Sequence, residues 1–287
     1  RLSSQTVKSS MSSALAAIVL GLLGATSPSR LGRREFASIV GAGGSIAVLG
    51  GDARVAHAAS KSVFVAGATG QTGRLVTRLL CERGGVAVVA GARNEAKARD
   101  LGLLCASIKH LDVGESIEAI AASLAGAECV VCALGFVPGN PLKMGEAAHL
   151  VDNVGTCKLI DACKMANVQQ FVLVSSILTA GRKWGQENSP GFRITNAFGG
   201  VLDEKLVAED HLKASGLGYV IVRPAGLRND VGGEITISGE NTLNSGEVAR
   251  SNVARVCVEA ALASPALKKV VELVETEKGT PSEQWFA

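Results

Sequence analysis

The stretch Val-Phe-Val-Ala-Gly-Ala-Thr-Gly-Gln-Thr-Gly, residues 63–73, decides how this chain folds. Its four apolar residues suit a buried strand, and they lead directly into three spaced glycines and a helix-like run over 75–80. Gly67 permits a tight turn, Gly70 lets the backbone approach phosphates, and Gly73 lets the helix pack against the strand. Because a helix N-terminus offers free amides and a positive dipole end, the stretch predicts a site for a dinucleotide pyrophosphate. The alternative is a glycine-rich turn that binds nothing.

Short apolar runs and helical patterns alternate along the rest of the chain. We expect strands at 62–67, 86–92, 104–109, 128–134, 170–175, 218–223 and 268–275. Helical patterns fall between them at 72–83, 94–101, 115–125, 149–166, 200–215 and 248–263. Strands that are apolar on both faces favour a parallel sheet covered by helices. The pattern therefore predicts an α/β fold, a single doubly wound parallel sheet of the Rossmann type, over residues 60–287.

Residues 1–59 differ from this body and are predicted to be a targeting leader. The segment holds six basic and two acidic residues, so 23 of the 29 basic and 24 of the 26 acidic residues remain for the body. An Arg33-Arg34 pair, an apolar run over 39–51 and Ala56-His57-Ala58 resemble a twin-arginine signal with its cleavage site. We expect a plastid transit peptide, either alone or followed by a signal for the thylakoid lumen. A balanced body with few aromatic residues argues against nucleic-acid partners.

The ligands of such sheets bind beyond the carboxyl ends of the strands, so we expect the cofactor contacts there. Arg93 follows the second strand, where no carboxylate occurs between Val86 and Asn94. An arginine here suits a 2′-phosphate, which favours NADP(H) over NAD(H). Arg74 could assist or lie at the surface. The full set of expected cofactor contacts is Gly67, Ala68, Thr69, Gly70, Gln71, Thr72, Gly73, Arg93, Asp112, Val113, Ala133, Leu134, Gly135, Asn153, Ser175, Lys205, Pro224 and Ala225.

Two of these positions have a specific alternative or partner. Asp112 could accept a hydrogen bond from the adenine amino group while Val113 packs on the ring, or it could cap the next helix.

The long loops 133–148, 175–199 and 224–246 suggest the walls of a pocket, with ordinary surface loops as the alternative. Candidate apolar lining residues are Leu134, Phe136, Ile177, Trp184, Phe192 and Phe198.

The seven cysteines and four histidines form no disulfide framework and no metal-ligand spacing, so we predict no metal. Cys129 and Cys132 have C-x-x-C spacing, but they lie in an apolar strand where residues three apart face opposite ways. Buried thiols are therefore favoured over a redox pair.

Several motifs together resemble the atypical short-chain dehydrogenase/reductases. They are the glycine turn, Asp152-Asn153-Val154-Gly155-Thr156, Phe171–Ser176, Lys205 with Ala208-Glu209, and Ile221–Leu227. The chain is most similar to plant and algal plastid NAD(P)-binding proteins, including those of plastoglobules, and to the NADP-binding part of the envelope translocon's redox subunit. The resemblance covers about residues 63–274.

The resemblance implies an active site of a serine, a tyrosine and a lysine, with the last two spaced Tyr-x-x-x-Lys. Lys205 matches the lysine, Ser175 or Ser176 the serine, and Asn153 the family's helix asparagine, but Val201 stands at the tyrosine position. The one tyrosine, Tyr219, lies in a predicted strand. A ketone reductase that lost this acid would lose roughly 10²–10⁴-fold in rate.

Two hypotheses follow for the function. One is an NADPH-dependent oxidoreductase for a hydrophobic quinone, flavin or carbonyl acceptor, with Lys205 and Ser176 or Thr179 orienting cofactor and substrate; Lys205 as sole acid/base is a weaker variant. The other is a non-catalytic NADP(H)-binding sensor or scaffold on a plastid complex, membrane surface or lipid particle.

Overall fold

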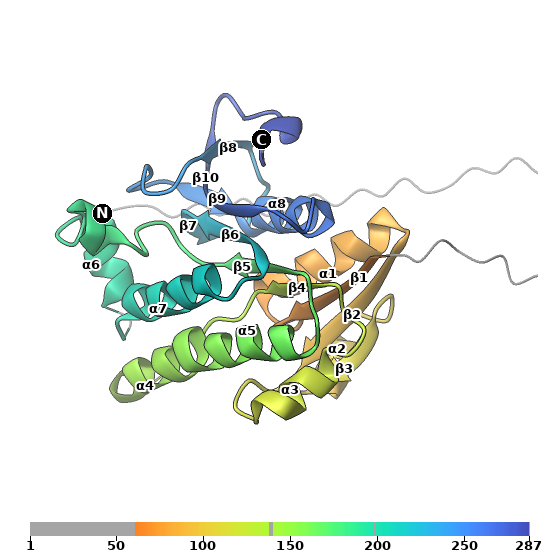
Figure 1. The fold of residues 1–287 in the computed structure, drawn as a ribbon. Coiled ribbons are helices and arrows are strands. Elements are labelled where there is room, and N and C mark those ends of the chain that lie inside the picture. Colours follow the sequence, from red (N-terminus) through yellow and green to blue (C-terminus); the bar gives the residue numbers. More distant parts are fainter. Residues whose placement is uncertain (1–60, 138–139, 198, 287) are drawn as a thin grey trace, which may run out of the picture. The chain divides into compact units, whose positions relative to one another are not determined.

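The computed structural model describes residues 61–137, 140–197 and 199–286, and the predicted leader lies outside them. An eight-stranded sheet runs through the described chain in the order β3-β2-β1-β4-β5-β6-β10-β8 (Figure 1). Its strands are β1 (Lys61–Ala66), β2 (Val86–Ala92), β3 (Ser107–His110), β4 (Cys129–Cys132), β5 (Gln170–Val174), β6 (Gly218–Pro224), β8 (Glu234–Ser238) and β10 (Lys268–Thr276). All neighbouring pairs are parallel except β8 with β10. A small second sheet pairs β7 (Gly226–Arg228) with β9 (Glu247–Ala249).

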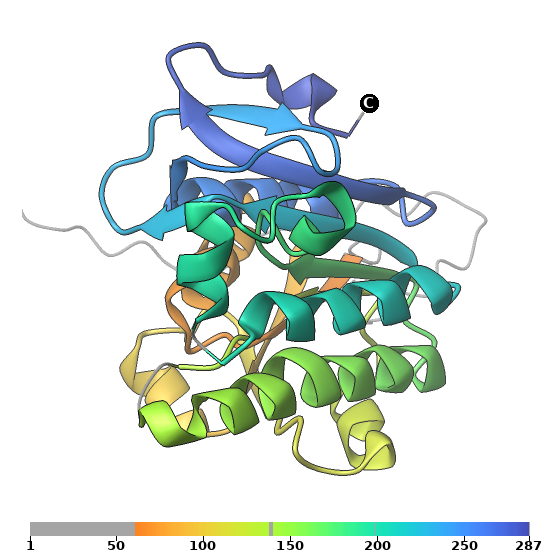
Figure 2. The ribbon, with the colours of Figure 1, turned by 90° about the vertical axis from the view of Figure 1, so that its left-hand side faces the viewer.

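Helices cover both faces of the large sheet (Figure 2). They are α1 (Gln71–Arg83), α2 (Glu95–Asp100), α3 (Ile117–Ser123), α4 (Met144–Ala148), α5 (Thr156–Met165), α6 (Pro190–Asn196), α7 (Val201–Ala214) and α8 (Arg250–Leu262). A π-helix, η2 (His149–Gly155), leads into α5, and short 3₁₀ turns lie at η1 (Pro141–Lys143), η3 (Gly181–Trp184) and η4 (Ser282–Gln284). Helices α1 and α8 pack together on one face, while α3, α5 and α7 follow one another on the other.

The two faces explain why the strands carry no polar alternation. Val63 and Val65 of β1 belong to the apolar cluster under α1 and α8. Phe64, between them, belongs to the cluster under α3 and α5. From Val63 onward both faces of β1 are buried and residues 63–66 are all apolar, which is the property that predicted a parallel sheet.

The predicted doubly wound Rossmann fold is confirmed, with differences in detail. Strand β3 begins at Ser107 because residues 103–106 form a turn, in which the Ala106 amide donates to the Leu103 carbonyl. The single helix predicted over 149–166 starts as a π-helix. The antiparallel β8, together with β7, α4 and α6, lies in segments that sequence patterns left as loops, and β9 overlaps the start of the helix predicted over 248–263.

The strand register places the important loops beside one another. In the central sheet Ala66 of β1 pairs with Gly91 of β2 on one side and with Cys132 of β4 on the other. The segments that follow β1, β2 and β4 therefore leave the sheet at the same edge. This carboxyl edge is where ligands bind in open α/β sheets.

Cysteine pairing was not anticipated from the sequence. Cys81, near the end of α1, forms a disulfide with Cys105, which precedes β3, and their Cα atoms are 6.0 Å apart. Cys129 and Cys132 are free and buried, and burial raises the pKa of the Cys129 thiol to about 12 and that of Cys132 to about 11.

Within the described ranges no helix is long and apolar enough to cross a membrane, and no His, Cys, Asp and Glu side chains gather as a metal-ligand set.

Candidate cofactor and active site

The glycine turn between β1 and α1 is shaped by close backbone contacts. Gly67 has a φ of +81°, which favours glycine, and a Cβ there would lie 2.8 Å from the Ala133 carbonyl oxygen. A Cβ on Gly73 would lie 2.2 Å from the Gly67 carbonyl oxygen, so only glycine lets the helix approach the turn. Gly70 is the N-cap of α1, and no side chain caps the helix. The first amides of α1 are thus left for an anion.

Arg93 lies directly beyond β2, beside the glycine turn. The Ala68 amide donates to the Gly91 carbonyl at 3.2 Å, which holds the turn against the end of β2. Arg93 is exposed and makes no hydrogen bond or ion pair within the described part of the chain. The next residue, Asn94, caps α2 by accepting from the Lys97 amide. The side chain of Arg74, a partly buried residue, likewise has no partner among the described residues.

Asp112 and Val113 lie beyond the end of β3. Asp112 Oδ1 accepts from the Gly114 amide at 2.9 Å, while the N-cap of α3 is Ser116. The alternative role of Asp112 as the helix cap is therefore wrong, because a serine closer to the helix fills it. Val113 is buried against Gly155, where a Cβ would lie 2.6 Å from Val113 Cγ2. The valine is thus fixed at the rim of the sheet.

The loop after β4 crosses over the glycine turn. The Ala133 amide donates to the Ala66 carbonyl, and the Ala133 carbonyl lies above Gly67. Leu134 and Gly135 continue along the carboxyl edge, and the Phe136 amide then donates to Asp152 Oδ2 at 3.0 Å. This hydrogen bond ties the loop to η2.

The position of the missing tyrosine is filled by packing. Val201 is the first residue of α7 and is only 8% exposed, within the apolar core. Lys205 lies one turn further on, with its Nζ 2.7 Å from Asp152 Oδ1 and its side chain 17% exposed. Burial lowers the pKa of Lys205, but Asp152, together with smaller effects of Cys132 and Glu209, outweighs burial and the pKa is raised overall. Tyr219, on β6, packs against the core cluster.

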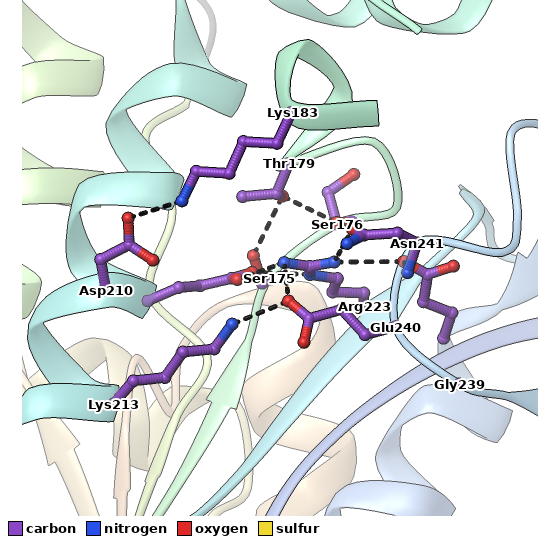
Figure 3. A network of polar contacts seen from close by, with 12 residues as sticks. Ser175, Ser176, Thr179, Lys183, Asp210, Lys213, Arg223, Gly239, Glu240 and Asn241 are labelled. Atoms are coloured by element: carbon purple, nitrogen blue, oxygen red, sulfur yellow. Dashed lines mark hydrogen bonds and ion pairs between the residues drawn. The ribbon is translucent and has the colours of Figure 1, made fainter. Parts of the chain in front are cut away.

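Hydroxyl groups lie just beyond β5 (Figure 3). Ser175 Oγ is buried and 3.2 Å from Thr179 Oγ1, which donates to the Ser176 carbonyl at 2.7 Å. Ser176 is partly exposed, and its hydroxyl has no partner in the described residues. Leu178, in the same turn, has a φ of +65°, an uncommon conformation for a bulky residue and typical of constrained sites.

Three other residues that were predicted to contact the cofactor form hydrogen bonds within the protein. Asn153 Nδ2 donates to Glu204 Oε2 at 2.7 Å, so its side chain points toward α7. The Pro224 carbonyl accepts from the Ile177 amide, and the Ala225 amide donates to the Leu273 carbonyl. These residues hold the edge together, which leaves few of their polar atoms for a ligand.

Sequence reasoning missed a buried ionic cluster between β6, α7 and β10 (Figure 3). Arg223 of β6 is fully buried and binds Glu209 of α7 through Nε at 3.0 Å and through a second guanidinium nitrogen at 2.6 Å. It also reaches Glu272 of β10 at 3.2 Å and Glu240 at 3.2 Å. The signal was available, because an arginine inside an apolar strand next to a proline requires a buried partner.

The predicted apolar pocket lining is mostly core. Ile177 and Phe192 are buried, and Phe136 and Trp184 pack against the same cluster, while Leu134 packs against the cluster on the other face of the sheet. Phe198 lies outside the described residues. A shallow hollow of about 430 Å³ instead lies along α6, lined by Asn188, Pro190, Arg193, Ile194 and Ala197. The expectation that Ile177 and Phe192 face an open pocket is therefore wrong, since both side chains are buried in the apolar core.

The sheet order, glycine turn and lysine position define a Rossmann protein of the dinucleotide-binding kind. The chain belongs to the family of NAD(P)H-binding proteins, which matches residues 67–264. The resemblance to atypical short-chain dehydrogenase/reductases is confirmed by this match and by the relatives below.

An uncharacterized chloroplastic protein of Arabidopsis thaliana, At2g34460, is 43% identical over 75% of this chain and 77% of its own length. Protein TIC 62, chloroplastic, of Pisum sativum is 34% identical over 77% of this chain, which spans 45% of the pea protein. Sanguinarine reductase of Eschscholzia californica is 28% identical over 76% of this chain and 90% of that enzyme. Among solved structures, a Bacillus halodurans protein classed with NAD-dependent epimerases and dehydratases superposes with a TM-score of 0.66 at 26% identity, covering 76% of this chain and 96% of the other.

Proposed function

We propose that this chain is a plastid NADP(H)-binding protein that transfers hydride to a hydrophobic acceptor requiring no proton from the protein. The observation that carries the cofactor assignment is Arg93, which is exposed and unpartnered in the described residues, beside the uncapped N-terminus of α1. A guanidinium in this place can take a 2′-phosphate through two parallel hydrogen bonds. The chloroplastic relatives support the plastid assignment, and stroma and thylakoid lumen are both compatible with it.

The shape of the glycine turn supports binding of a dinucleotide. Side chains are excluded from Gly67 and Gly73 by backbone atoms, and the amides that open α1 face the edge of the sheet. Gly67–Gly73 would hold the pyrophosphate, Arg93 the 2′-phosphate, and Asp112 with Val113 the adenine. Bound there, NADPH supplies a hydride. The protein would bind, orient and shield the reacting groups.

The choice of acceptor follows from what the site lacks. Val201 replaces the usual proton donor, and Lys205 is held as a cation by Asp152, so its raised pKa makes it a poor acid near neutrality. Quinones and flavins accept hydride and take their proton from solvent afterwards, so placement governs their reduction. Ser176, whose hydroxyl is unpartnered in the described chain, could orient such an acceptor.

The cofactor assignment is tested by measuring NADPH and NADH affinity for the wild-type protein and Arg93→Ala. Loss of a charged hydrogen-bonding group costs about 1.5–3 kcal/mol, so the Kd for NADPH should rise roughly ten- to hundredfold and that for NADH little. Arg99→Ala is the matched control, because Arg99 is also exposed but pairs with Glu95 on α2. Equal effects of Arg93→Ala on both cofactors would refute the phosphate assignment.

A second candidate function is a non-catalytic NADP(H) sensor or scaffold in a plastid complex. The buried Val201 favours it, and so does the likeness to TIC 62. Stopped-flow absorbance with quinones, flavins and small carbonyls separates the two. Tight NADPH binding without turnover of any acceptor, together with a stable partner in native gels of the organelle, would support the scaffold. Turnover by the free protein would support the enzyme.

A further inference from the structure

Asp152 is a buried carboxylate that contacts two other segments of the site besides its own. Its side chain is 0% exposed and projects from the π-helix η2. Oδ2 accepts from the Phe136 amide at 3.0 Å, and Oδ1 lies 2.7 Å from Lys205 Nζ. Oδ1 has no hydrogen-bond partner of good geometry among the described residues, so the lysine contact is an ion pair. Three segments, η2, α7 and the loop after β4, therefore meet at one carboxylate.

Such a buried charge requires a counter-charge, and Lys205 is the cation that contacts it. The nearby carboxylates of α7 have other partners, so Asp152 is the main acidic partner of Lys205. Glu204, next to Lys205 on α7, faces His149 and Asn153. Glu209, one turn further, binds Arg223. In the same way, Asp161 of α5 pairs with His211 of α7, and Asp203 with Arg182.

We propose that Asp152 is the positioning residue of the site: it keeps Lys205 cationic and fixed in place, and it anchors the 133–137 loop to the same point. The tyrosine that would stand beside the lysine in the resembling enzymes is replaced by Val201 in the core. The lysine is positioned instead by a carboxylate from a different helix. The inference rests on the proposed function in one respect, namely that Lys205 contacts the bound cofactor.

The charged and titratable groups that act on Lys205 come from three elements. They are Asp152 of η2, Cys132 of β4 and Glu209 of α7 itself. Cys132 is a neutral thiol because burial raises its pKa to about 11, and Glu209 is neutralised by Arg223. Removing the charge of Asp152 therefore leaves a largely buried ammonium without its main partner, and the pKa of Lys205 should fall.

The test uses Asp152→Asn, a near-isosteric change that keeps an acceptor for the Phe136 amide. NADPH affinity is measured from about pH 7 to about pH 9, where a normal lysine stays charged. The wild-type Kd should change little. The Asp152→Asn Kd should lie within about threefold of wild type at the lower pH and at least tenfold above it at the higher pH, as Lys205 loses its proton. Lys205→Met and the double variant should bind weakly and without this dependence.

Thermal unfolding without cofactor over the same range gives an independent measurement. In the wild type the raised pKa of Lys205 stabilises the fold fully below the unfolded lysine value, and this is lost only above the range tested. In Asp152→Asn the folded pKa lies below the unfolded one, so the unfolded chain binds more protons and stability rises with pH. Adding Lys205→Met should abolish that rise.

Each result decides one question. An Asp152→Asn affinity that is flat with pH, or that changes equally in the Lys205→Met background, overturns the positioning role. If no variant and no wild-type protein binds NADPH, the proposed function fails, while the melting curves still decide whether Asp152 is the counter-ion of Lys205. Melting curves that lack the pH trend overturn the counter-ion assignment itself.

Discussion

Two parts of the described chain differ in how their polar groups are used: residues 61–137, and the part that follows residue 139. In the first part the opening amides of α1 and the Arg93 side chain lack partners in the described residues. In the second part Lys205, Arg223 and Asn153 are bound by other parts of the chain. Groups that a fold leaves open at a cleft commonly serve a ligand, whereas paired buried groups fix the structure. The proposed cofactor contacts are thus available to a ligand, and the charged groups around Lys205 and Arg223 are bound within the protein.

The largest effect on this comparison is expected in the second part of the chain, from removal of the Arg223 charge. Arg223→Met leaves Glu209 and Glu272 buried without a counter-charge, and we expect the free energy of unfolding to fall by about 3–5 kcal/mol. Urea denaturation measures it. Arg99→Met, which removes an exposed pair with Glu95, should change stability little. A similar loss in both variants would contradict the structural role of the buried cluster.

In the first part of the chain, phosphate binding by the glycine turn is tested by adding one methyl group at Gly73. Gly73→Ala places a Cβ 2.2 Å from the Gly67 carbonyl oxygen, so α1 must shift away from the turn. We expect the NADPH Kd to rise on the order of a hundredfold, which is about 3 kcal/mol. Calorimetry measures it. Gly239→Ala is the matched control, since a Cβ there meets nothing within 4 Å. Wild-type affinity in Gly73→Ala would show that the turn does not hold the phosphates.

The smallest expected effect contrasts two adjacent serines. Ser175 is buried and hydrogen-bonded to Thr179, so Ser175→Ala should cost about 1 kcal/mol of stability. Ser176 is partly exposed with an unpartnered hydroxyl in the described residues, and Ser176→Ala should stay within about 0.5 kcal/mol. If the protein turns over an acceptor, Ser176→Ala should slow it more than Ser175→Ala does. A larger loss of stability in Ser176→Ala than in Ser175→Ala would mean that the Ser176 hydroxyl is hydrogen-bonded within the protein.

The sequence predicted the elements whose causes are local. The glycine turn and strands β1, β2, β5 and β6 follow from runs of apolar residues and their punctuation, and these lie within a residue or so of the predicted ranges. Helix α6 was missed because its seven residues are too short for a helical period to show. The π-helical start at His149 was missed because its composition is that of an ordinary helix.

The features that escaped prediction are pairings between distant residues. Arg223 and Glu272 are 49 positions apart, and Cys81 and Cys105 are 24 apart. Nothing in the spacing of either pair specifies its partner, because the strand order brings them together. The same holds at Lys205, where the family motif indicated the lysine but could not show that Asp152 of another helix holds it.

The Cys81–Cys105 bond encloses the segment that carries Arg93, from the end of α1 through β2 and α2. By limiting the freedom of the denatured chain, a link of this span adds roughly 3 kcal/mol to stability in the chain-entropy account. The stability of the folded protein therefore depends on whether its surroundings keep this disulfide oxidised. Oxidising conditions would preserve this link around Arg93, and reducing conditions would remove it.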